Sequence, residues 1–151
     1  MWARVRRFSA LPGPAKGLFL RAAVLLPLLT ISLRLRGFRS TQGLLQKFLG
    51  GSLKSLPEQT LNECVAITSR MVLAAARYSP IPSTCLERSL SLWWLLARQN
   101  ISTQLRIGVK KDGQRFAAHA WVERNGAAIA ELDASHLHFA AFDEEMSGDA
   151  W

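Results

Sequence analysis

Hydrophobic residues recur every three or four positions in the segment that follows Ser55, which predicts an amphipathic helix. The positions on its apolar face are Leu61, Cys64, Val65, Thr68, Met71, Val72 and Ala75. Ser55 is followed three residues later by Glu58, the spacing of a capping box, so we expect the helix to begin there. It should end before Ser79, because Pro80 and Pro82 require an extended connection.

A second capping box, formed by Thr84 and Glu87, predicts that the next helix begins at Cys85 and runs to about Gln99. No charged residue lies within residues 89–97 of this segment. A helix without a polar face is normally surrounded by protein. We therefore expect it to be the central helix of the fold.

The pattern changes to the alternation of a strand after residue 100. Residues 103–110 form the first predicted strand, and a turn at 111–113 leads into a second strand at 116–123. The Asn-Gly pair at 125–126 predicts another hairpin turn, after which a third strand follows at 127–132. Helices followed by strands indicate an α+β fold, in which the central helix packs on an antiparallel sheet.

The first fifty residues form a basic and apolar region. A helix is predicted at residues 16–35, bent or interrupted at Pro27, and a second, short helix at residues 41–49. A glycine-rich step then marks the expected boundary. The chain accordingly divides into a helical region, residues 1–50, and a second domain, residues 51–151.

The net charge of +8 belongs to the N-terminal part of the 151-residue chain. Residues 1–56 contain ten Lys or Arg and no acidic residue, whereas residues 57–151 hold nine basic and eleven acidic residues. Such a segment suits phosphate, anionic lipid or an acidic protein surface, because Coulomb attraction does not distinguish among them.

The apolar N-terminal segment is not expected to cross a membrane. Its uncharged run, residues 22–33, is too short to span the hydrocarbon core, although a helix here could lie on the membrane surface. The two cysteines, Cys64 and Cys85, do not make a disulfide framework, and free thiols indicate a reducing cytoplasm. We therefore expect a cytoplasmic protein, with peripheral contact at the inner membrane face left open.

Cys85 is the candidate nucleophile, because the first turn of a helix stabilises a thiolate through its free N–H groups and the positive end of the helix dipole. The same N–H groups can stabilise the oxyanion of a tetrahedral intermediate. Alone, a cysteine at a helix start would more often be a small buried hydrophobic residue.

His119 supplies the second half of the candidate site. It lies in an apolar strand, flanked by alanines that leave room for another group, and an imidazole there could accept the thiol proton. A cysteine on a helix, then a histidine on a strand, then an acid on the next strand is the order found in papain-like and transglutaminase-like enzymes. Glu131 and Asp133 are the candidates for the acid.

Hairpin register decides whether an acid can reach His119. A two-residue loop at 125–126 would place His119 opposite Leu132 and turn both carboxylates to the other face of the sheet. We predict a three-residue loop, with Gly126 as a left-handed bulge, which places His119 opposite Glu131 and diagonal to Asp133.

Three motifs carry a resemblance to a known family. Cys-Leu-Glu-Arg-Ser-Leu at 85–90, Arg-Ile-Gly-Val at 106–109 and Ala-His-Ala-Trp-Val-Glu at 118–123 resemble the stand-alone leader peptidases of lasso-peptide biosynthesis. That family is a transglutaminase-like branch of the papain-type fold. The likeness extends to the basic N-terminal region and implies cleavage of a precursor's leader by a Cys, His and Asp triad. Glu131 stands where the family usually has Asp, with Asp133 two residues later.

The resemblance also implies partners. They are the leader of the precursor peptide, a separate leader-binding protein, and a cyclase that closes the freed N-terminus onto an acidic side chain. The basic N-terminal region would be a docking face for the leader-binding protein or the cyclase.

Other signals carry less weight. His136 and His138 have no third ligand at metal spacing, so neither a metal nor another cofactor is expected, and Cys64 belongs to an apolar helix face. Two rival functions stay open. A transglutaminase-like acyl transferase would use the same acyl-enzyme, and a basic membrane or nucleic-acid binding module would need only residues 1–56. Within the leader-peptidase interpretation, no nucleic-acid partner is expected.

Overall fold

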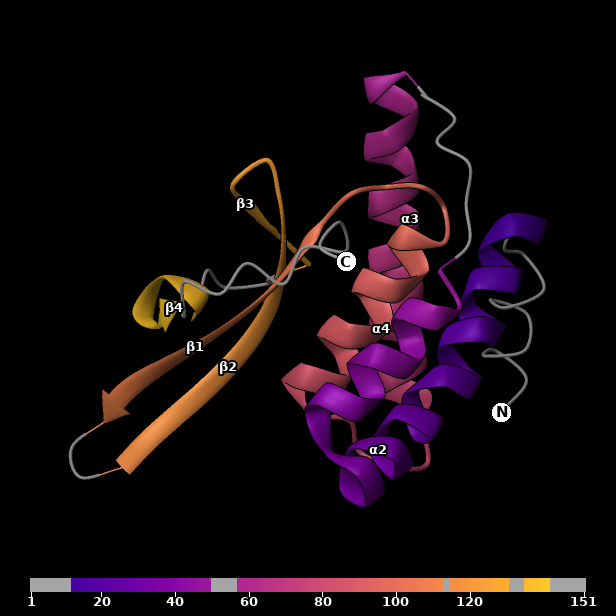
Figure 1. Ribbon diagram of the computed structural model, residues 1–151. Coiled ribbons are helices and arrows are strands. Elements are labelled where there is room, and N and C mark those ends of the chain that lie inside the picture. Colours follow the sequence, from indigo (N-terminus) through magenta and orange to yellow (C-terminus); the bar gives the residue numbers. More distant parts are fainter. Residues whose placement is uncertain (1–11, 50–56, 113–114, 131–134, 142–151) are drawn as a thin grey trace.

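The protein is a helical layer joined to an antiparallel sheet, as a computed structural model shows for residues 12–49, 57–112, 115–130 and 135–141 (Figure 1). The elements in chain order are the helices α2 (Gly13–Lys47), α3 (Glu58–Tyr78) and α4 (Cys85–Ala97), the strands β1 (Gln104–Asp112), β2 (Arg115–Arg124) and β3 (Ala127–Ile129), the 3₁₀ turn η1 (Ser135–His138), and β4 (Ala140–Ala141). The strands are ordered β3-β2-β1-β4. The predicted α+β class is confirmed.

Helix α2 is a helical hairpin whose bend falls at Gly37 and not at Pro27. The helix continues through Pro27, whereas Gly37 has φ 75° and ψ 178°. This backbone conformation is accessible essentially only to glycine. The two arms are joined by Thr41, whose hydroxyl donates to the carbonyl of Gly37 at 2.8 Å and lies 2.9 Å from the Ser32 hydroxyl. The prediction of two helices separated between residues 35 and 41 is therefore correct, and the predicted interruption at Pro27 is wrong.

Helix α3 has the predicted apolar face but begins later than predicted. Its N-cap is Pro57, which makes no side-chain cap hydrogen bond. The expected N-cap at Ser55 is therefore wrong as the start of the helix, and Ser55 itself lies outside the described residues. Pro57 has the extended conformation that suits the residue before a helix, and Glu58 begins the first turn. Thr68, Met71 and the other C-terminal positions of the predicted face are buried.

Helix α4 is the centre of the fold, as its uncharged sequence predicted. It contacts α2, α3, β1 and β2. Thr84 and Glu87 form the predicted capping box, so the helix begins at Cys85. The buried core around it is built from Ala22, Leu26, Leu29, Leu45, Val72, Ala75, Leu90, Leu92, Trp93, Leu95, Leu96, Ile101, Leu105 and Val122.

The end of α2 is fastened to the end of α4 by two side chains. The indole N–H of Trp94 donates to the carbonyl of Leu45 at 3.0 Å, and a guanidinium N–H of Arg98 donates to the carbonyl of Phe48 at 3.0 Å. The Arg98 guanidinium also lies over the Trp94 ring. The helical N-terminal region thus shares one core with the later helices.

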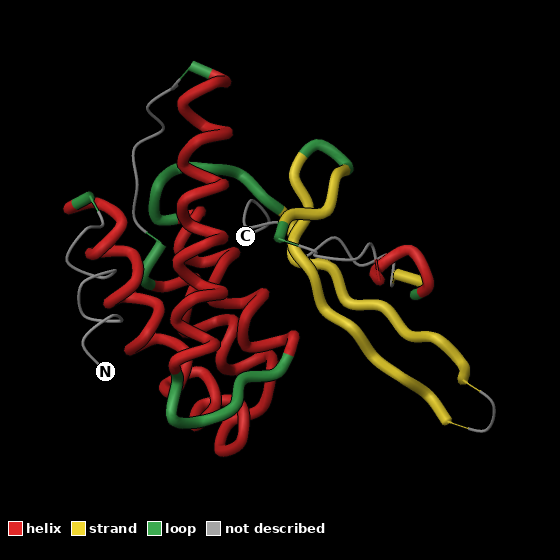
Figure 2. The backbone as a smooth tube through the Cα atoms, turned by 180° about the vertical axis from the view of Figure 1, so that it is seen from behind, coloured by secondary structure: helices red, strands yellow, loops and turns green. Residues whose placement is uncertain are grey.

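Strands β1 and β2 form a long hairpin that projects away from the helices in both views (Figures 1 and 2). Gly108 pairs with His119 in this ladder. The short strand β4, which the sequence did not reveal, pairs with β1 through Gly108 and Val109. Two alanines carry little strand signal of their own, so this pairing depends on tertiary contacts.

The turn between β2 and β3 has two residues, so the predicted three-residue loop is wrong. Arg124 pairs directly with Ala127, and both Asn125 and Gly126 have positive φ, as a type I′ turn requires. The ladder then stops at Ile129, because Ala130 adopts φ 63° and leaves the strand conformation. The alternation of a ladder therefore cannot be extended past Ile129.

Candidate active site

Cys85 is the first residue of α4, and its thiol is partly exposed. The Thr84 hydroxyl accepts the backbone N–H of Glu87, and the Glu87 carboxylate accepts the N–H of Thr84 in return. This box fixes the start of the helix at the cysteine. The thiol accordingly lies at the positive end of the helix dipole, as the sequence predicted.

Ser89 joins the helix that carries Cys85 to the strand that carries His119. Its hydroxyl donates to the backbone carbonyl of Ala120 at 2.9 Å, and the bond is buried. Residues four apart lie on the same helix face, so Cys85 and Ser89 share the face that meets β2, about 6 Å apart along the helix axis. Ala120 directly follows His119. The second turn of α4 thus contacts the β2 backbone beside His119, whereas the His119 side chain lies on the face of β2 opposite Val122, which packs in the core with α4.

His119 lies on a strand face that it shares with two other residues of its motif. Side chains alternate along a strand, so His119, Trp121 and Glu123 lie on one face, and Ala120 and Val122 lie on the other. Val122 is buried in the main core. The His119 ring stacks on Trp121 with the centroids 5.9 Å apart and meets Phe139 at 5.2 Å. The imidazole is partly exposed between these rings.

Glu123 holds the tryptophan that stacks on His119. The Trp121 indole N–H donates to one carboxylate oxygen of Glu123 at 2.7 Å, and the other oxygen lies 3.4 Å from Nε of Arg106. The indole cannot turn without losing this charged acceptor. Three alternate residues of the Ala-His-Ala-Trp-Val-Glu motif therefore form one connected unit.

Gly108 provides the space in which this unit packs. It is directly opposite His119, and a Cβ at this position would lie 2.9 Å from the carbonyl oxygen of Ala140 and 2.9 Å from the Trp121 ring. It would also lie 3.0 Å from Cβ of Phe139. These contacts are too close for any side chain. The glycine of the Arg-Ile-Gly-Val motif is thus a packing requirement of the site.

Glu131 and Asp133, the candidates for the third member of a triad, lie outside the described residues. The two-residue turn removes the register argument that favoured Glu131. The left-handed backbone at Ala130 then changes the direction of the chain just before them. Near the same unit, the ring of His136 lies 5.9 Å from Trp121, and His138 is exposed on η1. Among the described residues, no three side chains come together as metal ligands.

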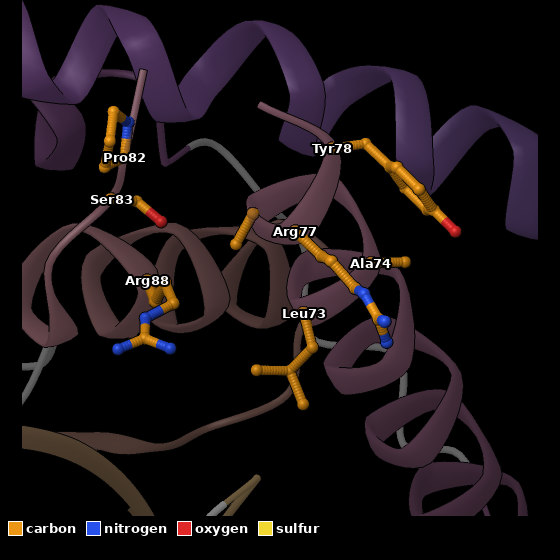
Figure 3. Close-up of a pocket in the computed structure, with 8 residues that line it drawn as sticks. Leu73, Ala74, Arg77, Tyr78, Pro82, Ser83 and Arg88 are labelled. Atoms are coloured by element: carbon orange, nitrogen blue, oxygen red, sulfur yellow. The ribbon is translucent and has the colours of Figure 1, made fainter. Parts of the chain in front are cut away.

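A cavity of about 560 Å³ lies beside the start of α4 (Figure 3). It is lined by Leu73, Ala74, Ala76, Arg77, Tyr78, Pro82, Ser83 and Arg88. Helix α3 supplies the apolar floor, and the connection to α4 supplies the opposite wall. The lining includes two guanidinium groups and no carboxylate. Arg88 is the one residue of α4 in this lining, so the cavity touches the first turn of the helix that begins with Cys85.

The structure adds four residues to the site that the sequence alone did not identify. They are Ser89, Gly108, Trp121 and Glu123. All four lie within the three motifs, and the alternation along β2 already placed Trp121 and Glu123 on the face of His119. The long-range partner of Ser89 could not be inferred, because nothing local in the sequence brings a helix residue to Ala120.

The family model described as Transglutaminase-like superfamily matches residues 22–142. A search of curated proteins and a search of solved structures each gave no match. The family match covers most of the chain, including α4, the β1–β2 hairpin and most of α2. The transglutaminase-like superfamily includes cysteine peptidases and acyltransferases. By this match, the chain belongs to the transglutaminase-like superfamily.

Proposed function

We propose that the protein is a cysteine peptidase that removes the leader from a lasso-peptide precursor. The Cys85 thiolate attacks the carbonyl carbon of the scissile peptide bond, after its proton has passed to His119. The carbon–nitrogen bond then breaks as His119 gives the proton to the leaving amine. Water hydrolyses the resulting thioester and regenerates the thiol.

The observation that carries this proposal is the buried hydrogen bond from Ser89 to the carbonyl of Ala120. It joins the helix of Cys85, one turn after the thiol, to the strand of His119, and these are the two elements from which a reacting thiol and imidazole would come. The free N–H groups of the first turn of α4 would also stabilise the oxyanion of the intermediate. The start of α4 would then stabilise both the thiolate of Cys85 and the negative charge of the oxyanion.

The choice of a leader peptide as substrate rests on the resemblance of the three motifs. In this proposal the precursor is presented by a separate leader-binding protein, and the product passes to a cyclase. In this proposal the cavity beside the first turn of α4 holds peptide residues near the scissile bond, because Arg88 of that turn lines it and its floor is apolar. Glu131 or Asp133 is the proposed acid that orients His119.

The test combines the purified protein with a candidate precursor and its leader-binding partner, and measures leader release by mass spectrometry. We expect Cys85→Ala and His119→Ala to abolish release. Cys64→Ala and His138→Ala are the matched controls, because they remove the same side-chain types from α3 and η1, and both should retain activity. Full activity in Cys85→Ala would refute the proposal.

Acyl transfer is the second candidate, because the same thioester can be resolved by an amine. Adding a primary amine at high concentration to the reaction distinguishes the two outcomes. A peptidase gives a product with a free carboxylate at the cleavage point, whereas an acyl transferase gives the amide of the added amine. Each product has its own mass.

A further inference from the structure

Helix α2 exposes a row of large aliphatic side chains on the side that faces away from the core. These residues are Leu20 (55% exposed), Val24 (61%), Leu28 (57%), Ile31 (49%) and Leu35 (79%). Successive members are three or four residues apart, so they lie on one helix face. We call this row the apolar stripe. Contiguous exposed apolar surface on a protein marks an interaction site.

The opposite side of the same helix is already occupied. Its buried residues include Leu18, Ala22, Leu26 and Leu29, and the helix packs on α3 and α4. Helix α2 is long and apolar enough to cross a membrane by length and composition. However, its buried face is held by the rest of the domain, so only the apolar stripe is left for another surface.

Cationic side chains flank the apolar stripe, and α2 contains no acidic residue. Arg21 is adjacent to Leu20, and Arg34 is adjacent to Leu35. Both arginines are exposed, and neither forms an ion pair within the described part of the chain. The surface is therefore apolar along its centre and positively charged beside both ends.

We infer that the apolar stripe is a membrane-binding surface that lies in the interface of a bilayer containing anionic lipids. All five side chains are aliphatic, and the exposed Arg21 and Arg34 beside them supply the positive charge that complements anionic lipid headgroups. The arginine stems can lie along the acyl boundary while the guanidinium groups reach lipid phosphates. The inference does not depend on the peptidase activity.

The test measures binding of the full chain to vesicles by flotation. We expect binding to vesicles of phosphatidylcholine and phosphatidylglycerol that weakens with salt, and weak binding to phosphatidylcholine alone. Leu28→Glu and Ile31→Glu should each lower the affinity by about tenfold or more, because a buried aliphatic side chain is lost and a negative charge is added. Arg21→Gln should lower it by roughly fivefold for anionic vesicles.

The matched control is Leu137→Glu, which makes the same change at another exposed leucine (73% exposed) on η1. It should bind vesicles like the wild type. Thermal unfolding of each variant checks the fold, and Arg21→Gln keeps the test valid if a glutamate variant fails to fold. Equal vesicle binding by wild type and stripe variants would overturn the inference. So would a wild type that binds no vesicles, or one that uses the stripe only for self-association or for the leader-binding protein.

Discussion

The hydroxyl of Ser89 and the carbonyl of Ala120 form a buried 2.9 Å hydrogen bond between α4 and β2. Ser89→Ala removes the donor and leaves a buried carbonyl with one partner fewer. We expect the free energy of unfolding to fall by about 1–3 kcal/mol. We also expect leader cleavage to slow through kcat more than through KM, because the bond positions catalytic elements and does not touch the substrate.

Ser91→Ala is the control for this prediction. Ser91 is a buried serine on the same helix, and its hydroxyl has no hydrogen-bond partner in the described structure. Removing it should leave stability unchanged or slightly higher. Equal losses in the two variants, measured by urea unfolding, would contradict the role given to Ser89.

The hydrogen bond between Trp121 and Glu123 predicts that substitutions of the two residues have coupled effects on the free energy of unfolding. Trp121→Phe keeps an aromatic side chain, with a single smaller ring, and loses the indole N–H, and Glu123→Ala removes the acceptor of that N–H. Each change should lower stability, and the double variant should lose less than the sum of the two, by about 1–3 kcal/mol. A double-mutant cycle in urea measures this coupling, and strict additivity would show that the bond contributes nothing.

Gly108 should not tolerate even one methyl group. We expect Gly108→Ala to lower the free energy of unfolding by about 1–3 kcal/mol, because the added Cβ would meet the Ala140 backbone and the Trp121 ring. Activity should fall as well, since His119 stacks on that ring. Gly43→Ala is the control, because a Cβ there meets nothing within 4 Å, and helix propensity should make that change stabilising.

Gly37 is predicted to be required for its backbone conformation and not for space. Nothing lies within 4 Å of an added Cβ, but φ is +75°. Gly37→Ala should therefore cost about 1–3 kcal/mol of stability. Gly17→Ala, at an open position earlier in the same helix, should instead stabilise the protein. Thermal unfolding of the two variants should shift in opposite directions.

The cavity beside α4 predicts a specific effect on substrate binding. Ala74→Phe adds a ring to the cavity wall, and we expect KM for the precursor to rise by roughly tenfold, since about 1.4 kcal/mol of binding is enough for that change. Ala66→Phe adds the same ring to an exposed position on α3 and should leave KM unchanged. Steady-state kinetics of leader release would separate the two, and equal KM values would place the peptide elsewhere.

Much of the helical part of the fold could be predicted from local signals. The Thr84 and Glu87 box fixed the start of α4, and the uncharged run after it correctly predicted a surrounded helix. The predicted interruption at Pro27 did not occur, because tertiary packing can override the unfavourable helix propensity of a proline. The bend lies at Gly37 instead, because residues other than glycine rarely adopt its positive φ.

The strand part of the site was harder to predict. The Asn-Gly pair is a strong signal for the two-residue turn that the structure contains. A three-residue loop was expected because it would place Glu131 opposite His119. The left-handed backbone at Ala130 could not be predicted, because alanine has no preference for it. Strand β4 also depends on contacts that are distant in sequence.

Helix α4 is enclosed by α2, α3 and the first two strands, so local opening of the helix would require these contacts to separate. Beyond its free first turn, the hydrogen-bonded amides of the helix that carries Cys85 should exchange with solvent only when much of the domain opens. The outer part of the β1–β2 hairpin, where Phe116 is 76% exposed, can open by itself. Within the described residues, the helix of the thiol should thus open more slowly than the strand of His119, which runs from this enclosed centre toward the exposed end of the hairpin.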